Sequence, residues 1–293
     1  MDITRHPKAG HAALLLLVCI WAGFYVSLRS GGRLALEPAT LATLRFAPAG
    51  LLLLPRLWLN RRDLARVGPW RALLIVAGGG LGFFLLASIA LREASTDTAS
   101  VLILGTLPLM VALVGALWLR RWPSRGQWPA LALIVAGTAW IAIGNPALTA
   151  PTLWRLLACS LAWALYTVAL RASGLAVLDA AALVAAGSLL LLLPWLVLSP
   201  PWQLAELSPA TLLPPLLPPL LVQGVLVGLV ATLCYGFALE RLGSLRVAAA
   251  GALAPLLAAL MALALFGEAP AHAALPGMML LMGGVLASSR AAP

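Results

Sequence analysis

Ten apolar runs, each close to the length that crosses a lipid bilayer, leave almost no sequence over for a soluble domain. A helix spans a bilayer with about 20 consecutive apolar residues, and 62% of the 293 residues are hydrophobic. The sequence therefore predicts an all-α integral membrane protein with ten transmembrane helices. Their predicted ranges are 11–28, 38–58, 70–91, 96–119, 128–145, 153–171, 178–198, 216–238, 244–266 and 272–288.

The net charge of +10 follows the predicted topology, because nearly all basic residues lie in short loops between the apolar runs. Fourteen Lys and Arg fall on the side that holds both termini, and four arginines fall on the other side: Arg29, Arg33, Arg92 and Arg155. Basic loops stay in the cytoplasm. We therefore expect a multi-pass protein of the cell inner membrane with both termini cytoplasmic. Its expected partners are the lipid bilayer and a small-molecule substrate, with no nucleic acid. The oligomeric state is left open, and a monomer is compatible with the sequence.

A proline-containing apolar stretch occurs twice in the chain, 147 residues apart. Pro108 interrupts the stretch 90–118, and Pro255 stands at the equivalent place in the stretch 237–265. An interior proline removes a backbone hydrogen bond and clashes with the preceding turn, which a membrane helix tolerates when its neighbours satisfy the freed carbonyl. The duplication predicts a first five-helix repeat over residues 1–145 and a second over residues 146–293.

Each predicted repeat has an odd number of helices, so the second repeat enters the membrane from the opposite side. The sequence therefore predicts an inverted repeat, with a substrate site near the membrane midplane between the halves. The third and eighth runs each carry a Gly-x-x-x-Gly pair, Gly78 with Gly82 and Gly224 with Gly228. Such pairs let helix backbones approach closely, and we expect them to serve packing.

Several short segments occur in an order that is typical of one transporter family. They are Trp21-Ala22, the Leu-Arg-Phe segment 44–46, the Ala-Leu, Ala-Ser and Pro-Leu pairs within 90–109, and the Phe-Gly-Glu turn 266–268. Together they resemble the EamA branch of the drug/metabolite transporter superfamily, most closely the aromatic-amino-acid exporter type. The pair Arg120-Arg121 departs from the family, which often has Gly-Glu there. The resemblance implies ten helices around a central cavity, lined by helices one, three, four, six, eight and nine, and the export of small metabolites.

Aromatic residues recur at helical spacing in the first and sixth predicted helices. Trp21, Phe24 and Tyr25 share one helical face, and Trp163 and Tyr166 share the corresponding face of the sixth helix. Aromatic walls bind flat or amphipathic ligands, so these residues are candidates for substrate binding. The alternative is that the same rings form part of the packed core.

The third and eighth helices add four further candidates for substrate binding: Phe83, Ser88, Gln223 and Tyr235. Gln223 is the sharpest of these, because an amide inside a membrane needs a polar partner. Substrate contact and a hydrogen bond between helices explain it equally well.

Arg45 is the one formal charge that the sequence places well inside a predicted helix. Its guanidinium could bind a substrate carboxylate through two parallel hydrogen bonds. The sequence favours a structural role instead, in which the side chain reaches the nearby membrane surface or bonds a carbonyl group.

The two prolines are candidates for hinges. We expect Pro108 and Pro255 to kink the fourth and ninth helices near the midplane, where the kinks would shape the cavity or allow it to open on alternate sides. The hydroxyl of Thr106 is a further candidate for substrate binding, although such hydroxyls often bond their own helix backbone.

The positions of the acidic residues indicate whether transport is coupled to an ion. All nine lie at or near the ends of the predicted helices or in loops: Asp2, Glu37, Asp63, Glu93, Asp97, Asp179, Glu206, Glu240 and Glu268. Proton-coupled exporters of cations need an ionisable carboxylate in the pathway. The pattern therefore favours uncoupled or weakly coupled export of neutral or zwitterionic solutes. Glu93, Asp97 and Glu268 are candidates for ion coupling at the rim of the pathway, but the sequence favours solvated loop charges for all three.

The leading hypothesis is an exporter of amino acids, aromatic or otherwise hydrophobic, that works by alternating access and needs no cofactor or metal. Other small neutral metabolites or drugs are an alternative cargo. A membrane enzyme that acts on lipid would need a cluster of acids, histidines or a nucleophile, and the sequence offers none; a receptor or scaffold is disfavoured by the repeat. The sequence predicts no catalytic residues.

Overall fold

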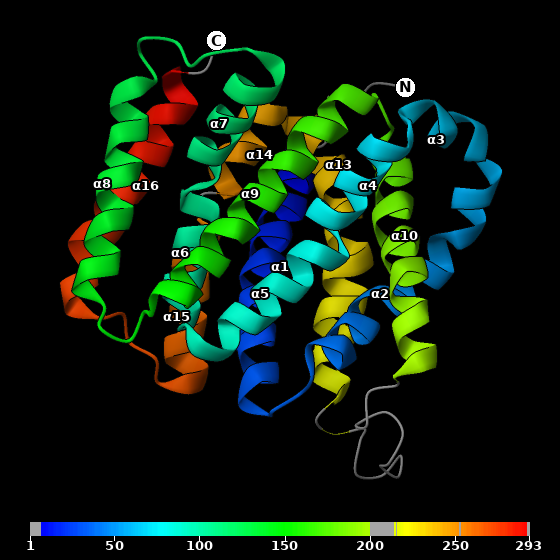
Figure 1. Ribbon diagram of the computed structural model, residues 1–293, viewed down its shortest axis with the longest axis horizontal. Coiled ribbons are helices and arrows are strands. Elements are labelled where there is room, and N and C mark those ends of the chain that lie inside the picture. Colours follow the sequence, from blue (N-terminus) through cyan, green and yellow to red (C-terminus); the bar gives the residue numbers. More distant parts are fainter. Residues whose placement is uncertain (1–6, 200–213, 215, 252, 292–293) are drawn as a thin grey trace.

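The computed structural model describes residues 7–199, 214, 216–251 and 253–291, which form a bundle of helices (Figure 1). The first half contains α1 (Pro7–Arg33), α2 (Pro38–Leu59), α3 (Arg61–Val67), α4 (Pro69–Gly79), α5 (Leu81–Glu93), α6 (Thr96–Gly105), α7 (Leu107–Leu119) and α8 (Trp128–Gly144). The second half contains α9 (Ala150–Ser173), α10 (Val177–Leu198), the π-helix η1 (Leu220–Val230), α13 (Ala231–Leu242), α14 (Ser244–Gly251), α15 (Ala254–Phe266), the short 3-10 helix η2 (His272–Ala274) and α16 (Leu275–Ala291).

Seven helical segments of the described chain are long and apolar enough to cross a membrane. Three further apolar helices, at Trp128–Gly144, Ala254–Phe266 and His272–Ser288, are shorter. The structure therefore supports a multi-pass membrane protein, while the count of ten crossings stays a prediction. Both chain ends are marked at the same end of the bundle, the top in Figure 1, as an even number of crossings requires. We call the opposite end of the bundle the lower end.

The helical segment that contains Pro108 is interrupted just before the proline, where the sequence predicts a kink. α6 ends at Gly105, and α7 begins at Leu107 with Pro108 in its first turn. The first turn of a helix suits proline, because its backbone N–H groups have no partner within the helix. Pro255 occupies the same position in α15, after α14 has ended at Gly251. The helical segment is thus interrupted just before each proline, as a kink there requires, and residues 96–118 still count as one stretch that could cross a membrane. The role of the two prolines as hinges stays a prediction.

The third and eighth predicted helices are also irregular, which the sequence did not predict. Gly80 separates α4 from α5, and the N–H of Leu81 donates to the hydroxyl of Ser188 on α10 at 3.0 Å. A Cβ on Gly80 would lie 2.1 Å from that hydroxyl oxygen, so the break requires glycine. In the second half, residues 220–230 wind as a π-helix, a form that is rare and frequent at functional sites.

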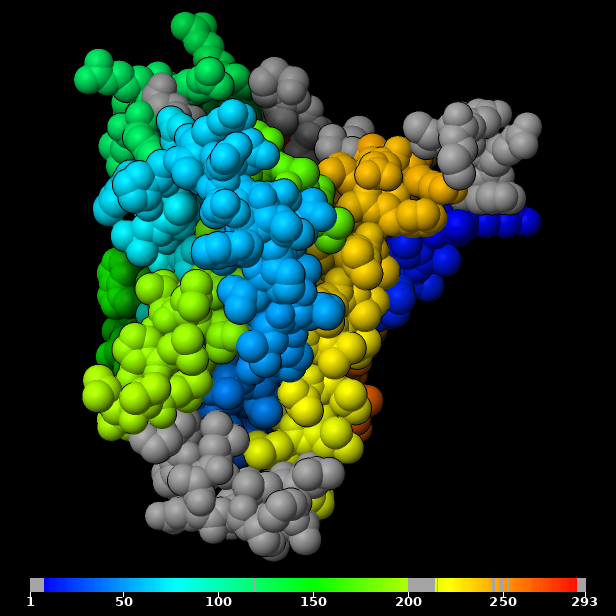
Figure 2. Space-filling view, turned by 90° about the vertical axis from the view of Figure 1, so that its right-hand side faces the viewer, coloured from blue at the N-terminus to red at the C-terminus, as the bar shows by residue number. Residues whose placement is uncertain are grey.

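The closest helix pairs join the two halves of the chain. α8 packs along α16, α2 along α10, α1 against α13, and α4 against α9. Figure 2 shows α2 flanked by α10 on one side and by η1 and α13 on the other.

Glycines line these pairs at the points of closest approach. A Cβ on Gly78 would lie 2.4 Å from the carbonyl oxygen of Ala162, and one on Gly224 would lie 2.5 Å from that of Leu44. The predicted packing role is therefore confirmed for Gly78 and Gly224, and a Cβ on Gly228 would likewise lie 3.1 Å from Cβ of Ala49 on α2. A Cβ on Gly82 would meet only the backbone of Ala77 in its own segment, so Gly82 does not serve a contact between helices.

Candidate transport site

Four aromatic rings form a continuous chain between the first and second halves. Phe24 on α1 stacks on Phe83 of α5 with ring centroids 5.9 Å apart. Phe83 meets Trp163 of α9 edge to face at 4.8 Å, and Trp163 meets Tyr166 at 5.3 Å. The candidate faces of α1 and α9 are thus joined through Phe83. We call Phe24, Phe83, Trp163 and Tyr166 the aromatic chain.

The remaining aromatic candidates lie beside this chain or apart from it. Tyr25 is buried and contacts Phe24 edge to face at 5.1 Å. Trp21 faces a different neighbour, the exposed Tyr235 of α13, at 6.3 Å. Trp21 also lies against Gly251 at the end of α14, where a Cβ would come within 3.1 Å of its ring. Trp21 and Tyr235 thus form a second aromatic pair next to the break that precedes α15.

Gln223 and Arg45 form a polar link from the π-helix to α1 and α2. The Gln223 side-chain amide donates to the carbonyl of Phe24 at 3.0 Å, and Arg45 donates to the backbone carbonyl of Gln223 at 2.9 Å. The guanidinium of Arg45 also lies 5.5 Å from the ring of Phe46. Arg45 therefore has the carbonyl partner expected for a structural role. Gln223 bonds a neighbouring helix, yet its own side-chain oxygen is buried without a partner among the described residues.

Two of the candidate hydroxyls bond the backbone of their own helix. The Ser88 hydroxyl donates to the carbonyl of Leu85 at 2.9 Å, and the Thr106 hydroxyl donates to that of Leu102 at 2.7 Å. Both side chains are buried. Each hydroxyl keeps acceptor capacity in this arrangement, but no described contact ties either one to the aromatic chain.

Three other buried side chains have polar atoms with no hydrogen-bond partner in the described part of the chain, and none of the three was predicted to bind the substrate. They are the hydroxyls of Ser27 and Ser160 and both carboxylate oxygens of Asp97. Asp97 is only 2% exposed, so the expectation of a solvated loop charge is wrong for this residue. Buried polar atoms without partners are rare in folded proteins and call for an explanation.

These unpartnered atoms lie between the aromatic chain and the lower end of the bundle. Ser27 follows Phe24 by three residues, and Ser160 precedes Trp163 by three, which places each hydroxyl about 4.5 Å closer to the lower end than its ring. Asp97 directly follows Thr96, which bonds Glu268 at the lower end. We call Ser27, Asp97, Ser160 and the Gln223 side-chain oxygen the polar layer, a name for buried polar groups that no described contact joins to one another.

Glu268 ties the ends of three helices together at the lower end. Its carboxylate accepts from Nε of Arg29 at 2.7 Å and from Nη2 of Arg33 at 2.8 Å. Its second oxygen accepts from the backbone N–H and the hydroxyl of Thr96, both at 3.3 Å. The Glu268 side chain is 11% exposed, so the expectation of a solvated charge is wrong here as well. We call Arg29, Arg33, Thr96 and Glu268 the Glu268 cluster.

Glu93 makes a second link between the halves at the same end. Its carboxylate accepts from Arg155 at 2.7 Å and from the hydroxyl of Thr152, both on α9. The Glu93 side chain is 47% exposed, so this contact is open to water, as the sequence led us to expect. Exposed ion pairs of this kind contribute little to stability.

The protein environment keeps Glu268 ionised. Desolvation by burial raises the pKa of its carboxyl, but hydrogen bonds from Arg29, Thr96 and Arg33 and the charge of Arg29 outweigh it and lower the pKa below the ordinary value. A carboxyl with a lowered pKa stabilises its contacts above its ordinary pKa and loses this contribution as the pH falls through the lowered value. The Glu268 cluster is therefore intact at neutral pH.

Substituting Glu268 with glutamine is expected to loosen the contact between α1 and α15 at the lower end. The amide keeps the size of the side chain but removes the charge that holds Arg29 and Arg33. Spin labels on the exposed Leu34 and Ala269 report this directly: the distance distribution should broaden and shift to longer values. Asp63→Asn, which removes an exposed ion pair with Arg66, should leave the distribution unchanged; identical distributions in wild type and E268Q would contradict the role of the cluster.

Two pockets described on the structure lie away from the aromatic chain. One lies between α2 and α10, and the other is lined by residues of α8 and α16 such as Leu133 and Met279. A central cavity therefore stays a prediction.

Comparison with known proteins places this geometry in a family. The model of the EamA-like transporter family matches residues 8–143 and again residues 151–290, which confirms the duplication. A solved structure titled "Crystal structure of protein" is similar to this chain, with a TM-score of 0.58 and 21% sequence identity, over 98% of this chain and 96% of that chain. At this identity the likeness shows a shared fold. No curated protein matches the sequence. Because the two matched segments cover nearly the whole chain, this multi-pass membrane protein belongs to the EamA-like transporter family.

Proposed function

We propose that the protein exports amino acids, aromatic or otherwise hydrophobic, from the cytoplasm across the inner membrane. The observation that carries this proposal is the aromatic chain, which bridges the two halves and lies three residues along α1 and α9 from the unpartnered hydroxyls of Ser27 and Ser160. An apolar or aromatic side chain of the substrate would pack on the rings. The polar layer, which is rich in acceptor atoms, would receive the hydrogen-bond donors of the substrate.

The ammonium group of an amino acid is the donor that fits this layer best. Asp97 brings a carboxylate, Gln223 an amide oxygen, and Ser27 and Ser160 bring hydroxyls, all without partners among the described residues. A charge-assisted hydrogen bond is about twice as strong as a neutral one. Asp97 is therefore the proposed partner of the substrate ammonium.

The halves are proposed to be inverted five-helix repeats, residues 1–145 and 146–293, that together cross the membrane ten times. The packing supports this: exchanging the halves converts the α1–α13 contact into the α9–α5 contact, and the α1–α15 contact into the α9–α7 contact. The α2–α10 and α8–α16 contacts are unchanged by the exchange. With cytoplasmic termini, the lower end of the bundle faces outward.

The Glu268 cluster and the irregular helices at Pro108 and Pro255 would together allow alternating access. The Glu268 cluster would close the outer side, since it joins the first and second halves at the lower end, between the polar layer and the outside. The helix breaks at Pro108 and Pro255 would serve as hinges, because residues between two short helices can change direction without breaking a continuous hydrogen-bond ladder. Export would then follow the substrate gradient, with no ion needed to drive it.

A substrate-panel assay in vesicles tests the proposed cargo. Tryptophan, phenylalanine, leucine, a neutral sugar and a cationic dye would be loaded at equal concentration, and efflux compared with empty vesicles. The proposal expects the three amino acids to leave faster than the sugar and the dye. Efflux of the dye or the sugar alone would assign the protein to other neutral metabolites or drugs, and turnover of vesicle lipid would indicate an enzyme.

Asp97→Asn is expected to lower phenylalanine transport by about tenfold, because a hydrogen bond to a charged group contributes about 1.5–3 kcal/mol. Transport of the desamino analogue, which lacks the ammonium group, should change little. Asp63→Asn provides the control for a lost exposed carboxylate. If D97N and wild type transport phenylalanine equally at equal expression, Asp97 does not bind the substrate.

A further inference from the structure

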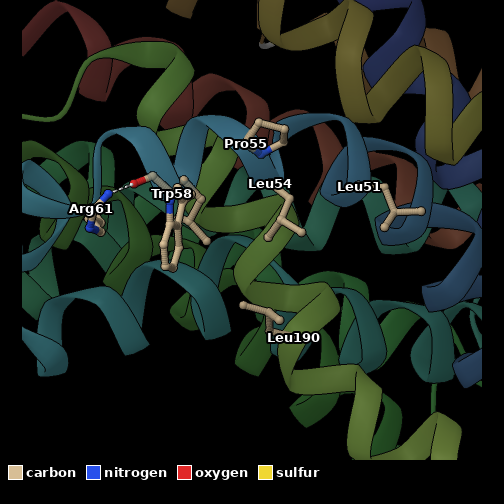
Figure 3. A pocket seen from close by; sticks show the side chains of 7 residues that line it. Leu51, Leu54, Pro55, Trp58, Arg61 and Leu190 are labelled. Atoms are coloured by element: carbon tan, nitrogen blue, oxygen red, sulfur yellow. Dashed lines mark hydrogen bonds between the residues drawn. The ribbon is translucent and has the colours of Figure 1, made fainter.

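An apolar groove runs along the outside of the bundle between α2 and α10. It has a volume of about 590 Å³ and is lined by Leu51, Leu54, Pro55, Leu57, Trp58, Arg61 and Leu190. Figure 3 shows the row of side chains from α2 above Leu190 of α10, with Arg61 at one end of the row. The volume falls within the range of ligand sites, about 300–1,000 Å³.

The side chains along the groove are not covered by the rest of the protein. Trp58 is 68% exposed, Leu51 62% and Leu190 49%. In a membrane protein such a surface faces lipid chains, which are as apolar as leucine. The groove therefore suits a hydrocarbon chain that lies along α2.

Arg61 supplies a positive charge where the groove meets the membrane surface. It follows the end of α2, at the end of the bundle that holds the chain termini and that we predict to be cytoplasmic. Its guanidinium lies 4.9 Å from the Trp58 ring and donates one hydrogen bond, to the carbonyl of Trp58 at 3.1 Å. This contact fixes the guanidinium beside the groove, and a guanidinium has five donors.

Two nearby arginines pair with carboxylates, whereas Arg61 does not in the described part of the chain. Arg56 pairs with Asp179 at 2.7 Å, and Arg66 pairs with Asp63 at 3.0 Å. Arg61 has no carboxylate partner among the described residues. A basic site between transmembrane helices on the cytoplasmic side is a recognised binding place for anionic lipid headgroups, and a guanidinium binds phosphate through paired hydrogen bonds.

We propose that this groove binds an anionic phospholipid of the membrane. One acyl chain lies along Leu51, Leu54 and Leu190, and the headgroup phosphate accepts hydrogen bonds from Arg61. The site is separate from the aromatic chain and does not depend on which solute the protein transports. It would hold α2 and α10, one helix from each half, at a fixed separation.

Native mass spectrometry of the purified protein tests the proposal. The probes are phosphatidylglycerol and phosphatidylcholine with the same acyl chains, titrated into wild type, Arg61→Gln, Arg61→Lys and the control Arg71→Gln. Arg71 is an exposed arginine in the first turn of α4, outside the groove. Wild type should bind phosphatidylglycerol about fivefold more tightly than phosphatidylcholine, the effect of one basic residue near the membrane surface.

The variants distinguish binding of the anionic lipid at Arg61 from a general attraction of the lipid to the positively charged protein. R61Q should lose the preference for the anionic lipid, R61K should keep part of it, and R71Q should keep all of it. Leu190→Trp, which fills the groove, should weaken the binding of both lipids. The proposal is overturned if R61Q and R71Q lose the preference equally or not at all, or if the groove is occupied by a second copy of the chain, seen as a lipid-free dimer.

Discussion

Substituting Trp163 with alanine is expected to slow amino-acid export by about tenfold or more. Trp163 is the central link of the aromatic chain, with Phe83 on one side at 4.8 Å and Tyr166 on the other at 5.3 Å. An aromatic pair contributes about 0.5–1.5 kcal/mol beyond the area it buries, and about 1.4 kcal/mol corresponds to a tenfold change. Removing the ring would therefore take away both the wall for the substrate and the alignment of its neighbours.

The matched control is Trp195→Ala. Trp195 lies near the end of α10 and is 51% exposed. The control substitution therefore removes an indole of the same size from the surface of the protein. Efflux of tryptophan and phenylalanine from proteoliposomes is compared at equal protein content. Equal rates in the two variants would remove Trp163 from the transport site.

Substituting Gly78 with valine is expected to destabilise the fold more than any other single change discussed above. A Cβ at this position would lie 2.4 Å from the carbonyl oxygen of Ala162 and 3.1 Å from the backbone nitrogen of Tyr166, so α4 and α9 would have to separate. Overpacking of this kind costs about 1–3 kcal/mol. For a chain of this size we expect the melting temperature to fall by about 2–12 °C.

Gly283→Val is the control, because nothing lies within 4 Å of a Cβ at Gly283 and the residue is exposed on α16. Thermal unfolding in detergent, followed by tryptophan fluorescence or by loss of the monodisperse peak, measures both variants. If G78V cannot be purified, G78A is measured in its place, because the alanine Cβ makes the same close approach to the Ala162 carbonyl oxygen. Equal melting temperatures for the Gly78 and Gly283 variants would show that the helix approach is not tight.

The sequence predicted which residues share a helical face, but it did not predict which residues of other helices that face contacts. The spacing of Phe24 and Tyr25 placed both on the inner face of the first helix, and Trp163 was placed likewise on the sixth. Trp21 shares the predicted face with Phe24, yet it meets Tyr235 of α13 and not the aromatic chain. Periodicity fixes the side of a helix that a residue occupies, whereas the packing of other helices decides what it touches.

The prolines show the same limit for backbone geometry. Pro108 and Pro255 clearly interrupt their helices, because a proline cannot complete the hydrogen-bond ladder. Where the regular helix ends before each proline depends on the residues that precede it. Gly105 and Gly251 end α6 and α14, and glycine is a weak helix former that favours such an end.

The burial of Asp97 and Glu268 was not predicted from the sequence. Both residues lie near the end of a predicted helix, and a position near a helix end does not guarantee exposure to water. Asp97 is the second residue of α6, yet the residues around it leave it 2% exposed. One sequence signal was available: Arg29 and Arg33 lie on the side where basic residues are scarce, and such exceptions to the charge bias invite a search for acidic partners. Their partner, Glu268, follows at a distance of more than 230 residues, which local patterns do not reveal.

The most direct test of the proposed function is efflux from proteoliposomes loaded with radiolabelled phenylalanine, measured with the pH gradient collapsed and no added sodium. Wild-type protein should release phenylalanine down its gradient at the same rate with and without a pH gradient, and protein-free vesicles should retain it. Retention of phenylalanine by vesicles that hold folded protein would contradict the proposed export. Release that stops when the pH gradient is collapsed would contradict transport driven by the substrate gradient alone.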